Sequence, residues 1–187
     1  MKIPPQAQLV FKGKIFHTYQ WEQTMYDGST ATFEMLKRPD TVQVIPVVGD
    51  KIWLSFESQP NFAAHDSFLG GRVEEGEQPL SAAKRELLEE SGLYSEEWDL
   101  IAVHEPFHKM EWELYYYIAK NCRKIQEPHL DAGENIEIRQ YSFNEFVAKV
   151  TAKEFGYNQF SYELLQIKNN PAELQKLRAR FYDKIHS

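Results

Sequence analysis

Residues 71–93 read GRVEEGEQPLSAAKRELLEESGL, and this stretch joins a glycine-containing turn to a helix of unusual charge. Pro79 suits the first turn of a helix, Gly92 suits its C-terminal cap, and good helix formers lie between them. Apolar residues at spacings of three and four predict one buried face. They are Leu80, Ala83 and Leu87. The sequence therefore predicts a helix over residues 79–91.

The opposite face of this helix carries three glutamates, Glu86, Glu89 and Glu90, at spacings that bring their side chains together. Like charges at such spacings repel by roughly 0.2–0.5 kcal/mol per pair. The helix dipole also disfavours anions near a helix C-terminus. Helix propensity gives no reason for the cluster. A divalent cation would remove the penalty, because Mg²⁺ and Mn²⁺ prefer oxygen ligands and often bridge carboxylates to phosphates.

The segment before the helix adds groups of related chemistry. Gly70 and Gly71 allow a backbone carbonyl to approach a metal closely. Glu77 adds a further acid between this turn and the helix. Arg85 stands beside Glu86, where a guanidinium can fix carboxylates through paired hydrogen bonds.

In one register, these residues give a glycine, five spacers, Glu77, seven spacers, and then Arg-Glu-Leu-x-Glu-Glu-x-Gly-Leu. The pattern resembles the complete Nudix box. Seven fixed identities arise by chance at around 10⁻⁸ per position, which makes the resemblance specific. It implies a Nudix hydrolase with an α/β/α sandwich over about residues 40–150. A solvated acidic helix face is the alternative interpretation of the three glutamates alone.

The resemblance also implies a role for each matching residue. Glu89 and Glu90 are the implied principal ligands of Mg²⁺ or Mn²⁺, and Glu86 is a further ligand or the base for the attacking water. The Gly70 carbonyl is implied as another ligand, Glu77 as a supporting acid near the metal, and Arg85 as the group that orients the glutamates. The implied reaction is hydrolysis of a diphosphate linkage.

The rest of the chain predicts an α/β (α+β) fold with a mixed sheet. Strands are expected at residues 8–20, 30–36, 42–48, 52–56, 99–104, 113–119 and 136–141. Asp27-Gly28 predicts a hairpin turn, and 58–68 reads as a loop. Further helices are expected after Ser142, whose spacing to Glu145 predicts a capping box. We expect an N-terminal β region (1–39), a Nudix domain (40–150) and a C-terminal helical extension (151–187).

The N-terminal region narrows the subfamily. The lead-in from Phe33 to Val47 is similar to that of ADP-ribose pyrophosphatases and related nucleoside-diphosphate-sugar hydrolases. That resemblance implies a homodimer formed through the N-terminal strands, with Lys37 and Arg38 as nucleotide or phosphate contacts. A basic pair that ends a strand is the plainer alternative. The sequence also departs from the subfamily, because Ser58 and Gln59 follow Glu57 where an arginine is expected.

Two further segments carry candidate groups. The acidic loop before residue 136 resembles the loop that often supplies a catalytic base, with Glu134 the first candidate and Glu137 the second; a solvated acidic loop is the alternative. His104, Glu105 and His108 match a zinc-protease string, but Pro106 disfavours the helix that such a site needs. We expect instead a strand end from which His108 contacts the substrate.

Composition bounds the remaining choices. A net charge of −7 argues against a nucleic-acid polymer as partner. No apolar run is long enough to span a membrane, no signal peptide is expected, and the single Cys122 suits the cytoplasm. The best interpretation is hydrolysis of ADP-ribose or a related nucleotide sugar. The alternatives are a pyrophosphohydrolase for nucleoside triphosphates or dinucleoside polyphosphates, and a Nudix-fold module that senses a nucleotide without turnover.

Overall fold

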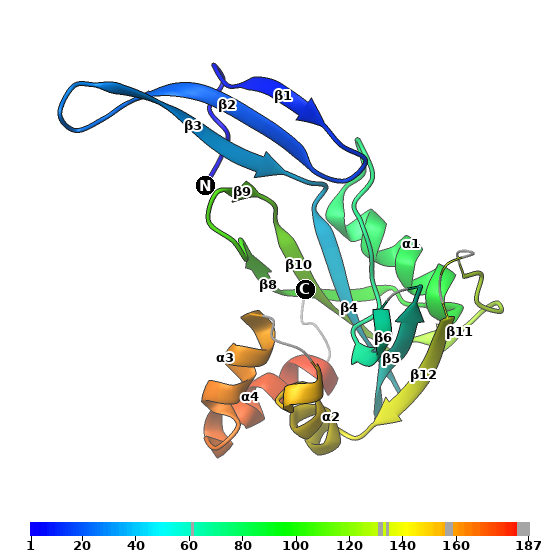
Figure 1. The fold of residues 1–187 in the computed structure, drawn as a ribbon. Helices are drawn as coiled ribbons and strands as arrows, with labels where there is room; N and C mark the ends of the chain where they lie inside the picture. Colours follow the sequence, from blue (N-terminus) through cyan, green and yellow to red (C-terminus); the bar gives the residue numbers. More distant parts are fainter. Residues whose placement is uncertain (61, 131–132, 134, 156–158, 183–187) are drawn as a thin grey trace.

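The computed structural model describes residues 1–187 except 61, 131–132, 134, 156–158 and 183–187 (Figure 1). The strands are β1 (Gln8–Lys12), β2 (His17–Thr24), β3 (Thr30–Lys37), β4 (Thr41–Val48), β5 (Lys51–Gln59), β6 (Phe62–Ser67), β7 (Leu93–Tyr94), β8 (Glu97–His104), β9 (Met110–Glu111), β10 (Leu114–Lys120), β11 (Arg123–Lys124) and β12 (Asn135–Tyr141). The helices are α1 (Pro79–Ser91), α2 (Phe143–Val150), the 3₁₀ turn η1 (Lys153–Phe155), α3 (Gln159–Ile167) and α4 (Pro171–Tyr182).

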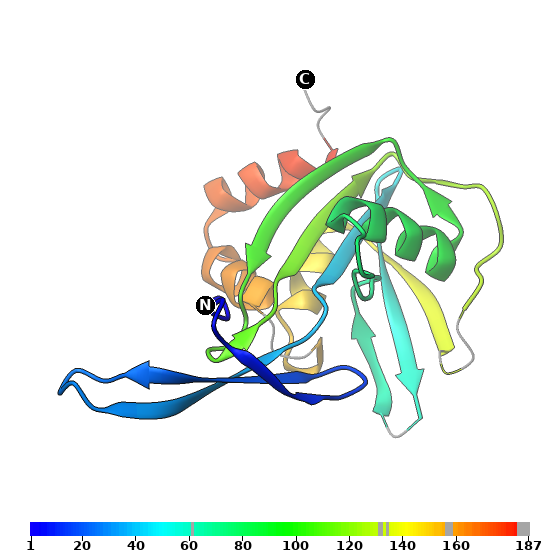
Figure 2. The same cartoon turned by 90° about the horizontal axis from the view of Figure 1, so that it is seen from above.

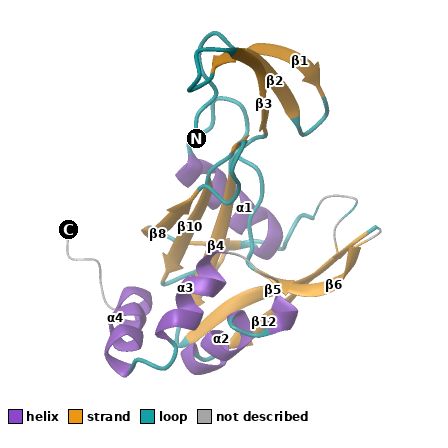
Figure 3. Cartoon of the chain, turned by 60° about the vertical axis from the view of Figure 1, so that its left-hand side comes forward, coloured by secondary structure: helices purple, strands orange, loops and turns teal. Residues whose placement is uncertain are grey.

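A mixed sheet of the order β12-β5-β4-β10-β8 forms the centre, and β6 pairs with β5. Strand β10 runs parallel to β4, whereas β8 runs antiparallel to β10. Helix α1 covers one face of this sheet, and α2, α3 and α4 cover the other (Figure 3). Strand β4 is buried on both faces, which explains its nearly continuous apolar sequence. The predicted α/β/α sandwich with a mixed sheet is confirmed.

The two faces of the sheet have separate hydrophobic cores. On the α1 side, the helix packs Ala82, Ala83 and Leu87 against Val42 and Val44 of β4. The other core is rich in aromatic residues from the C-terminal helices, and it includes Phe68, Tyr116, Phe143, Phe146, Phe155, Phe160 and Phe181. The C-terminal helices therefore hold the far side of the sheet in place while α1 presents its polar face on the near side.

The N-terminal strands form a second sheet of the order β1-β2-β3-β9. The β2–β3 hairpin turns at Asp27-Gly28, as predicted, with Gly28 at φ 84°. The hairpin projects beyond the rest of the molecule (Figure 2). Strand β1 is exposed along its length, including the apolar side chains of Leu9, Val10 and Phe11.

Two strand predictions differ from the structure. The stretch 8–20 is broken into β1 and β2 by a turn in which the Gly13 amide donates to the Phe16 carbonyl. The expectation of a loop at 58–68 was wrong, because β6 pairs along β5 from Ser55↔Ser67 to Gln59↔Phe62. The sequence of β6 has low strand propensity, so its structure comes from the neighbouring strand rather than from local preference.

The predicted helix boundaries agree closely with the structure. Helix α1 spans Pro79–Ser91, and Gly92 closes it with φ 71° and an amide that donates a hydrogen bond to the Leu88 carbonyl. Ser142 and Glu145 form the predicted capping box of α2. None of the helices in the described ranges combines the length and the apolar character that crossing a bilayer would require.

Candidate active site

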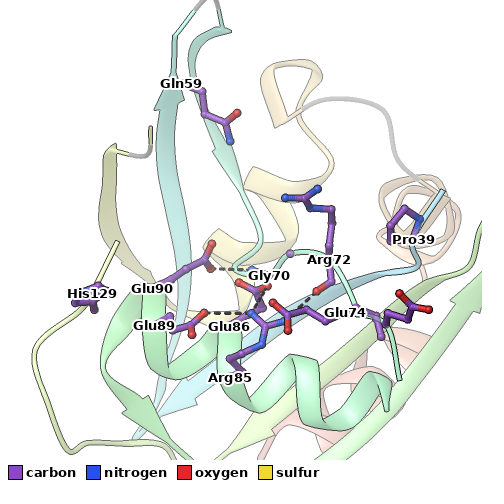
Figure 4. A pocket seen from close by; sticks show the side chains of 13 residues that line it. Pro39, Gln59, Gly70, Arg72, Glu74, Arg85, Glu86, Glu89, Glu90 and His129 are labelled. Carbon is purple, nitrogen blue, oxygen red and sulfur yellow. Dashed lines mark hydrogen bonds and ion pairs between the residues drawn. The ribbon is translucent and has the colours of Figure 1, made fainter. Parts of the chain in front are cut away.

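Helix α1 positions the three clustered glutamates by its attachment to the sheet. Its apolar face is fixed against β4, so Glu86, Glu89 and Glu90 lie on the face turned away from that core (Figure 4). Glu90 is only 6% exposed, although its side chain is a carboxylate. A carboxylate this deeply buried needs a defined partner, and one oxygen of Glu90 accepts a hydrogen bond of 2.8 Å from the Gly70 amide.

Arg85 donates hydrogen bonds to three carboxylates, those of Glu77, Glu86 and Glu89. Its Nε and Nη2 donate to the two carboxylate oxygens of Glu77 at 3.2 and 3.0 Å, which is a bidentate pair. Its Nη1 donates to Glu86 at 2.8 Å and to Glu89 at 3.1 Å, and Nη2 also reaches the Arg72 carbonyl at 3.0 Å. The hydrogen bond to Glu77 raises the pKa of Arg85 further above its ordinary range, and the same bond lowers the pKa of Glu77.

The Gly70-Gly71 segment lies so close to β4 and to Glu86 of α1 that an added Cβ atom at either glycine would meet a neighbouring atom. A Cβ atom on Gly70, whose φ is 141°, would stand 2.1 Å from the Val42 carbonyl oxygen. A Cβ atom on Gly71 would stand 2.3 Å from Oε1 of Glu86. The Leu69 and Gly71 carbonyls accept bonds from Val44 and Val42 at 2.7 and 2.9 Å, so β4 pins the segment. The Gly70 carbonyl lies between these two carbonyls in the chain and takes part in neither of the two hydrogen bonds.

These groups line one open cavity of about 680 Å³, which we call the glutamate cavity. Its lining residues are Pro39, Gln59, Gly70, Gly71, Arg72, Val73, Glu74, Glu75, Arg85, Glu86, Glu89, Glu90 and His129 (Figure 4). A concave site with several convergent charged groups is the usual place for a binding or catalytic centre. Its many carboxylates make it unsuited to an anionic ligand unless a cation is also bound.

The donor chemistry of the glutamate cavity fits a hard divalent cation. Carboxylate oxygens and a nearby backbone carbonyl are the ligands that Mg²⁺ and Mn²⁺ prefer. The Gly71 position also fits, because a side chain there would fill the space next to Glu86. Within the described ranges, no three metal-binding side chains form a ready-made cage. Arg85 holds Glu77, Glu86 and Glu89 in ion pairs.

A second cavity of about 550 Å³ adjoins the first and lies against the N-terminal sheet. We call it the N-terminal cavity, and its walls include Lys2, Lys12, His17, Lys37, Arg38, Asp40, Glu77 and Glu111. It shares Pro39, Val73, Glu74 and Glu75 with the glutamate cavity. The two cavities are therefore neighbouring compartments separated by one rim.

The comparison with known families decides the family. The description "NUDIX domain" matches residues 37–164, which is more than half of the chain. The chain belongs to the Nudix family. The family and the enzyme class predicted from the sequence, a Nudix pyrophosphohydrolase, are confirmed.

Several known proteins are similar to this Nudix chain over most of its length. An ADP-ribose pyrophosphatase of Bacillus subtilis (strain 168) is 24% identical over 165 residues, covering 85% of this chain and 89% of that protein. A methanol dehydrogenase activator of Bacillus methanolicus is 24% identical over 153 residues, covering 79% and 82%. A solved ADP compounds hydrolase superposes with a TM-score of 0.71 at 17% identity, covering 89% and 94%, which shows the shared fold.

The structure brings together Gly70, Arg85, Glu86, Glu89 and Glu90 in one cavity (Figure 4), and Glu77 is hydrogen-bonded to Arg85. Lys37 and Arg38 line the N-terminal cavity, together with Glu77. Lys37 pairs with Glu111 at 2.5 Å. Arg38 stacks on Trp112 at 4.3 Å from the ring centroid and also faces Phe16 at 5.7 Å.

Other predicted residues lie elsewhere or are not described. His108 is exposed in the turn between β8 and β9, and it is not among the residues that line either cavity. Glu134 falls outside the described residues. Glu137 pairs in register with Phe56, so it lies on the sheet face opposite to Trp53, which packs with α1, and it pairs with Arg139 at 3.1 Å.

The histidine string forms no helix. His104 is the last residue of β8, and its Nε2 lies 3.0 Å from a carboxylate oxygen of Glu163 in α3. Pro106 and His108 follow in the turn.

Sequence reasoning missed several residues that line the glutamate cavity, among them Gln59, Arg72 and His129. Arg72 could have been found, because it directly follows the box glycine in a turn that must lie near the acids. Gln59 arrives from the end of β5, and the His129 amide donates to the Glu89 carbonyl at 2.7 Å. Both depend on long-range pairing and carry no local signal.

Proposed function

We propose that this Nudix protein hydrolyses ADP-ribose, or a closely related nucleotide sugar, to a nucleoside monophosphate and a sugar phosphate. The observation that carries the proposal is the convergence of the box glutamates in one cavity that opens beside a second cavity, whose lining includes Lys12, Lys37 and Arg38 as well as acidic side chains. If the diphosphate linkage lies near the glutamates, one end of the substrate can extend into the N-terminal cavity. The names of the bacterial ADP-ribose pyrophosphatase and of the solved ADP compounds hydrolase support this substrate class.

A divalent metal belongs to the proposal. Nudix hydrolases generally need divalent metal ions. Glu86, Glu89, Glu90 and the Gly70 carbonyl would hold Mg²⁺ or Mn²⁺ here, with Glu77 as a supporting acid. When bound, the metal supplies charge for the phosphate oxygens and lowers the pKa of bound water.

The protein groups around the metal would divide the remaining work. Arg85, held by Glu77 at 3.0 Å, is placed to orient Glu86 and Glu89. Glu86 is the candidate base for the attacking water, because it lies in the cavity with one oxygen 2.8 Å from Arg85. Glu134 remains the alternative base.

Substrate recognition would fall to the N-terminal cavity. Arg38 is positioned by Trp112 and by a bond of 3.4 Å to the Thr41 hydroxyl, so its guanidinium is partly pre-oriented for a phosphate or a base. To bind the substrate, Lys37 would have to give up its ion pair with Glu111. His108 would need to approach from outside the two cavities.

We also propose a cytoplasmic homodimer, with residues 1–39 as the dimerisation element, residues 40–150 as the Nudix domain and residues 151–187 as a helical extension. The exposed apolar side chains of β1 support an interface with a second copy. Cys122 is buried and burial raises its pKa to about 12, which suits a structural thiol.

The test is a panel of ADP-ribose, nucleotide sugars, dinucleoside polyphosphates and nucleoside triphosphates, each incubated with Mg²⁺ or Mn²⁺. Release of AMP and ribose 5-phosphate in equal amounts from ADP-ribose, at the highest kcat/KM of the panel, supports the proposal. Preferred release of pyrophosphate from a triphosphate, or cleavage of a dinucleoside polyphosphate, would replace it with the alternative pyrophosphohydrolase.

A further inference from the structure

The glutamate cavity has an unusual charge balance for a site that receives a diphosphate. Its lining carries five carboxylates, Glu74, Glu75, Glu86, Glu89 and Glu90. The arginines in the same lining are Arg72 and Arg85. Arg85 is engaged by Glu77, Glu86 and Glu89, so its charge is already compensated. A further cation on the protein wall would favour the binding of an anionic substrate beside any bound metal.

Arg72 is the arginine of this lining whose guanidinium the carboxylates do not engage. Within the described part of the chain, its side chain makes no ion pair or hydrogen bond. Its side chain extends away from Arg85, on the side of Gln59 and Pro39 (Figure 4). The Arg72 guanidinium therefore lies in the cavity and apart from the carboxylates that Arg85 binds.

The backbone on both sides of Arg72 is fixed, so the side chain starts from a defined place. Arg72 forms a β-bridge with Thr41, and the Val73 amide donates to the Asp40 carbonyl at 2.8 Å. The Arg72 carbonyl accepts from Nη2 of Arg85 at 3.0 Å. Arg72 is thus tied both to the acid cluster and to the segment that follows Arg38.

Arg38 precedes Thr41, the bridge partner of Arg72, by three residues, so the two arginines belong to neighbouring segments. Burial lowers the pKa of Arg38, and the charge of Arg72 lowers it further. The Nε of Arg38 is buried and has no hydrogen-bond partner among the described residues. Pro39, which follows Arg38, lines both cavities. Two like charges at one rim are stabilised when an anion binds between them, and guanidinium groups bind phosphate oxygens through paired hydrogen bonds.

We propose that Arg72 is a substrate-binding residue that, with Arg38, holds the diphosphate at the rim between the glutamate cavity and the N-terminal cavity. The inference rests on the proposed function for the identity of the anion. In this proposal Arg72 stabilises the bound substrate and the transition state equally, because it contacts phosphate oxygens rather than the attacking water. Its loss should therefore raise KM much more than it lowers kcat.

The experiment compares wild type with Arg72→Ala, Arg72→Lys and the control Arg123→Ala. Arg123 is the first residue of β11, its side chain is 69% exposed, and it lines neither of the two cavities. Two quantities are measured for the full chain, both with Mg²⁺ present: KM and kcat for ADP-ribose, and the affinity for ADP by calorimetry. The melting temperature of each variant controls for folding.

We expect Arg72→Ala to raise KM and to weaken ADP binding by about ten- to a hundredfold, the usual effect of losing a hydrogen-bonded charge. Arg72→Lys should recover part of the loss, because it keeps the charge but not the planar fork. Arg123→Ala should match wild type. Unchanged KM and ADP affinity in both folded Arg72 variants would overturn the inference. If Arg72→Ala does not fold, Arg72→Lys decides, with a wild-type KM as the contradicting result.

The two proposals fail in distinguishable ways. Turnover of ADP-ribose by wild type reports on the proposed function, whereas the ratio of wild-type to variant ADP affinity reports on Arg72. A wild-type protein that binds ADP but cleaves no ADP-ribose removes the proposed function alone, and weaker ADP binding by the variants still supports Arg72. A wild-type protein that does neither overturns both.

Discussion

A Cβ atom on Gly71 would stand 2.3 Å from Oε1 of Glu86, so the glycine and the glutamate share one small space. The obstructing atom is the end of a flexible side chain, and the backbone of Gly71 is not in the left-handed region. Gly71→Ala should therefore fold with a loss of at most about 1 kcal/mol, the cost of an altered rotamer. Displacement of Glu86 should lower kcat by on the order of 10²-fold. Chemical denaturation and steady-state kinetics measure the two effects.

Gly49→Ala is the matched control for that substitution. Gly49 lies in the β4–β5 turn at φ 60° with open space around it, so alanine costs about 1–2 kcal/mol of backbone strain. Its kcat should stay at the wild-type value. The account fails if Gly71→Ala retains full kcat, or if both variants lose activity in proportion to stability.

Glu90→Gln should remove nearly all metal-dependent turnover, by on the order of 10³-fold, while the fold stays intact. Glutamine keeps an oxygen that can accept from the Gly70 amide, but it removes the buried negative charge. Titration of the initial rate with Mg²⁺ and Mn²⁺ measures the loss. Glu96→Gln, whose side chain is 73% exposed beside Arg123, is the carboxylate control. Wild-type rates in a folded Glu90→Gln protein would rule out Glu90 as a metal ligand.

Much of this site could be predicted because its determinants are local. Pro79 and Gly92 set the helix boundaries, and helical spacing alone places Glu86, Glu89 and Glu90 on one face. Strand β6 could not be predicted, because β5 and not its own sequence makes it a strand. The position of the Arg38 side chain could not be predicted from the sequence either. Its contact with Trp112 depends on the parallel pairing of β3 with β9, which joins residues far apart in the chain.

The N-terminal segment should be held in a pH-dependent way by Glu113. Its hydrogen bond from Lys2, at 2.6 Å, and that from the Tyr115 hydroxyl lower the pKa of Glu113 below its ordinary value of 4.5. The resulting stabilisation is present above pH 4.5 and is lost as the pH falls through the lowered pKa of the folded state. Because Lys2 is largely exposed, the ion pair contributes only about 0.5 kcal/mol.

Unfolding of wild type and Glu113→Gln across a pH series checks this prediction. The free energies of unfolding should differ at pH 7 and converge as the pH falls below 4.5. A difference that stays constant down to pH 3 would contradict the assignment of the effect to ionised Glu113.

The homodimer prediction can be tested on β1. Phe11 is 61% exposed, and Phe11→Asp would place a charge within the apolar surface that we assign to the interface. Light scattering at micromolar concentration should give a dimer for wild type and a monomer for this variant. Ile125→Asp, at a residue 53% exposed outside the N-terminal sheet, should remain dimeric. A monomeric wild type would remove the dimer from the account.

The central claim is that the box carboxylates support metal-dependent cleavage of a nucleotide-linked diphosphate. Its most direct test is the initial rate of AMP release from ADP-ribose by the wild-type chain, with Mg²⁺ and after excess chelator. With Mg²⁺ we expect rapid release of AMP with ribose 5-phosphate, and in chelator we expect the rate to return to the uncatalysed value. Tight binding of ADP-ribose without turnover, at any Mg²⁺ or Mn²⁺ concentration, would contradict it and indicate a nucleotide-sensing module.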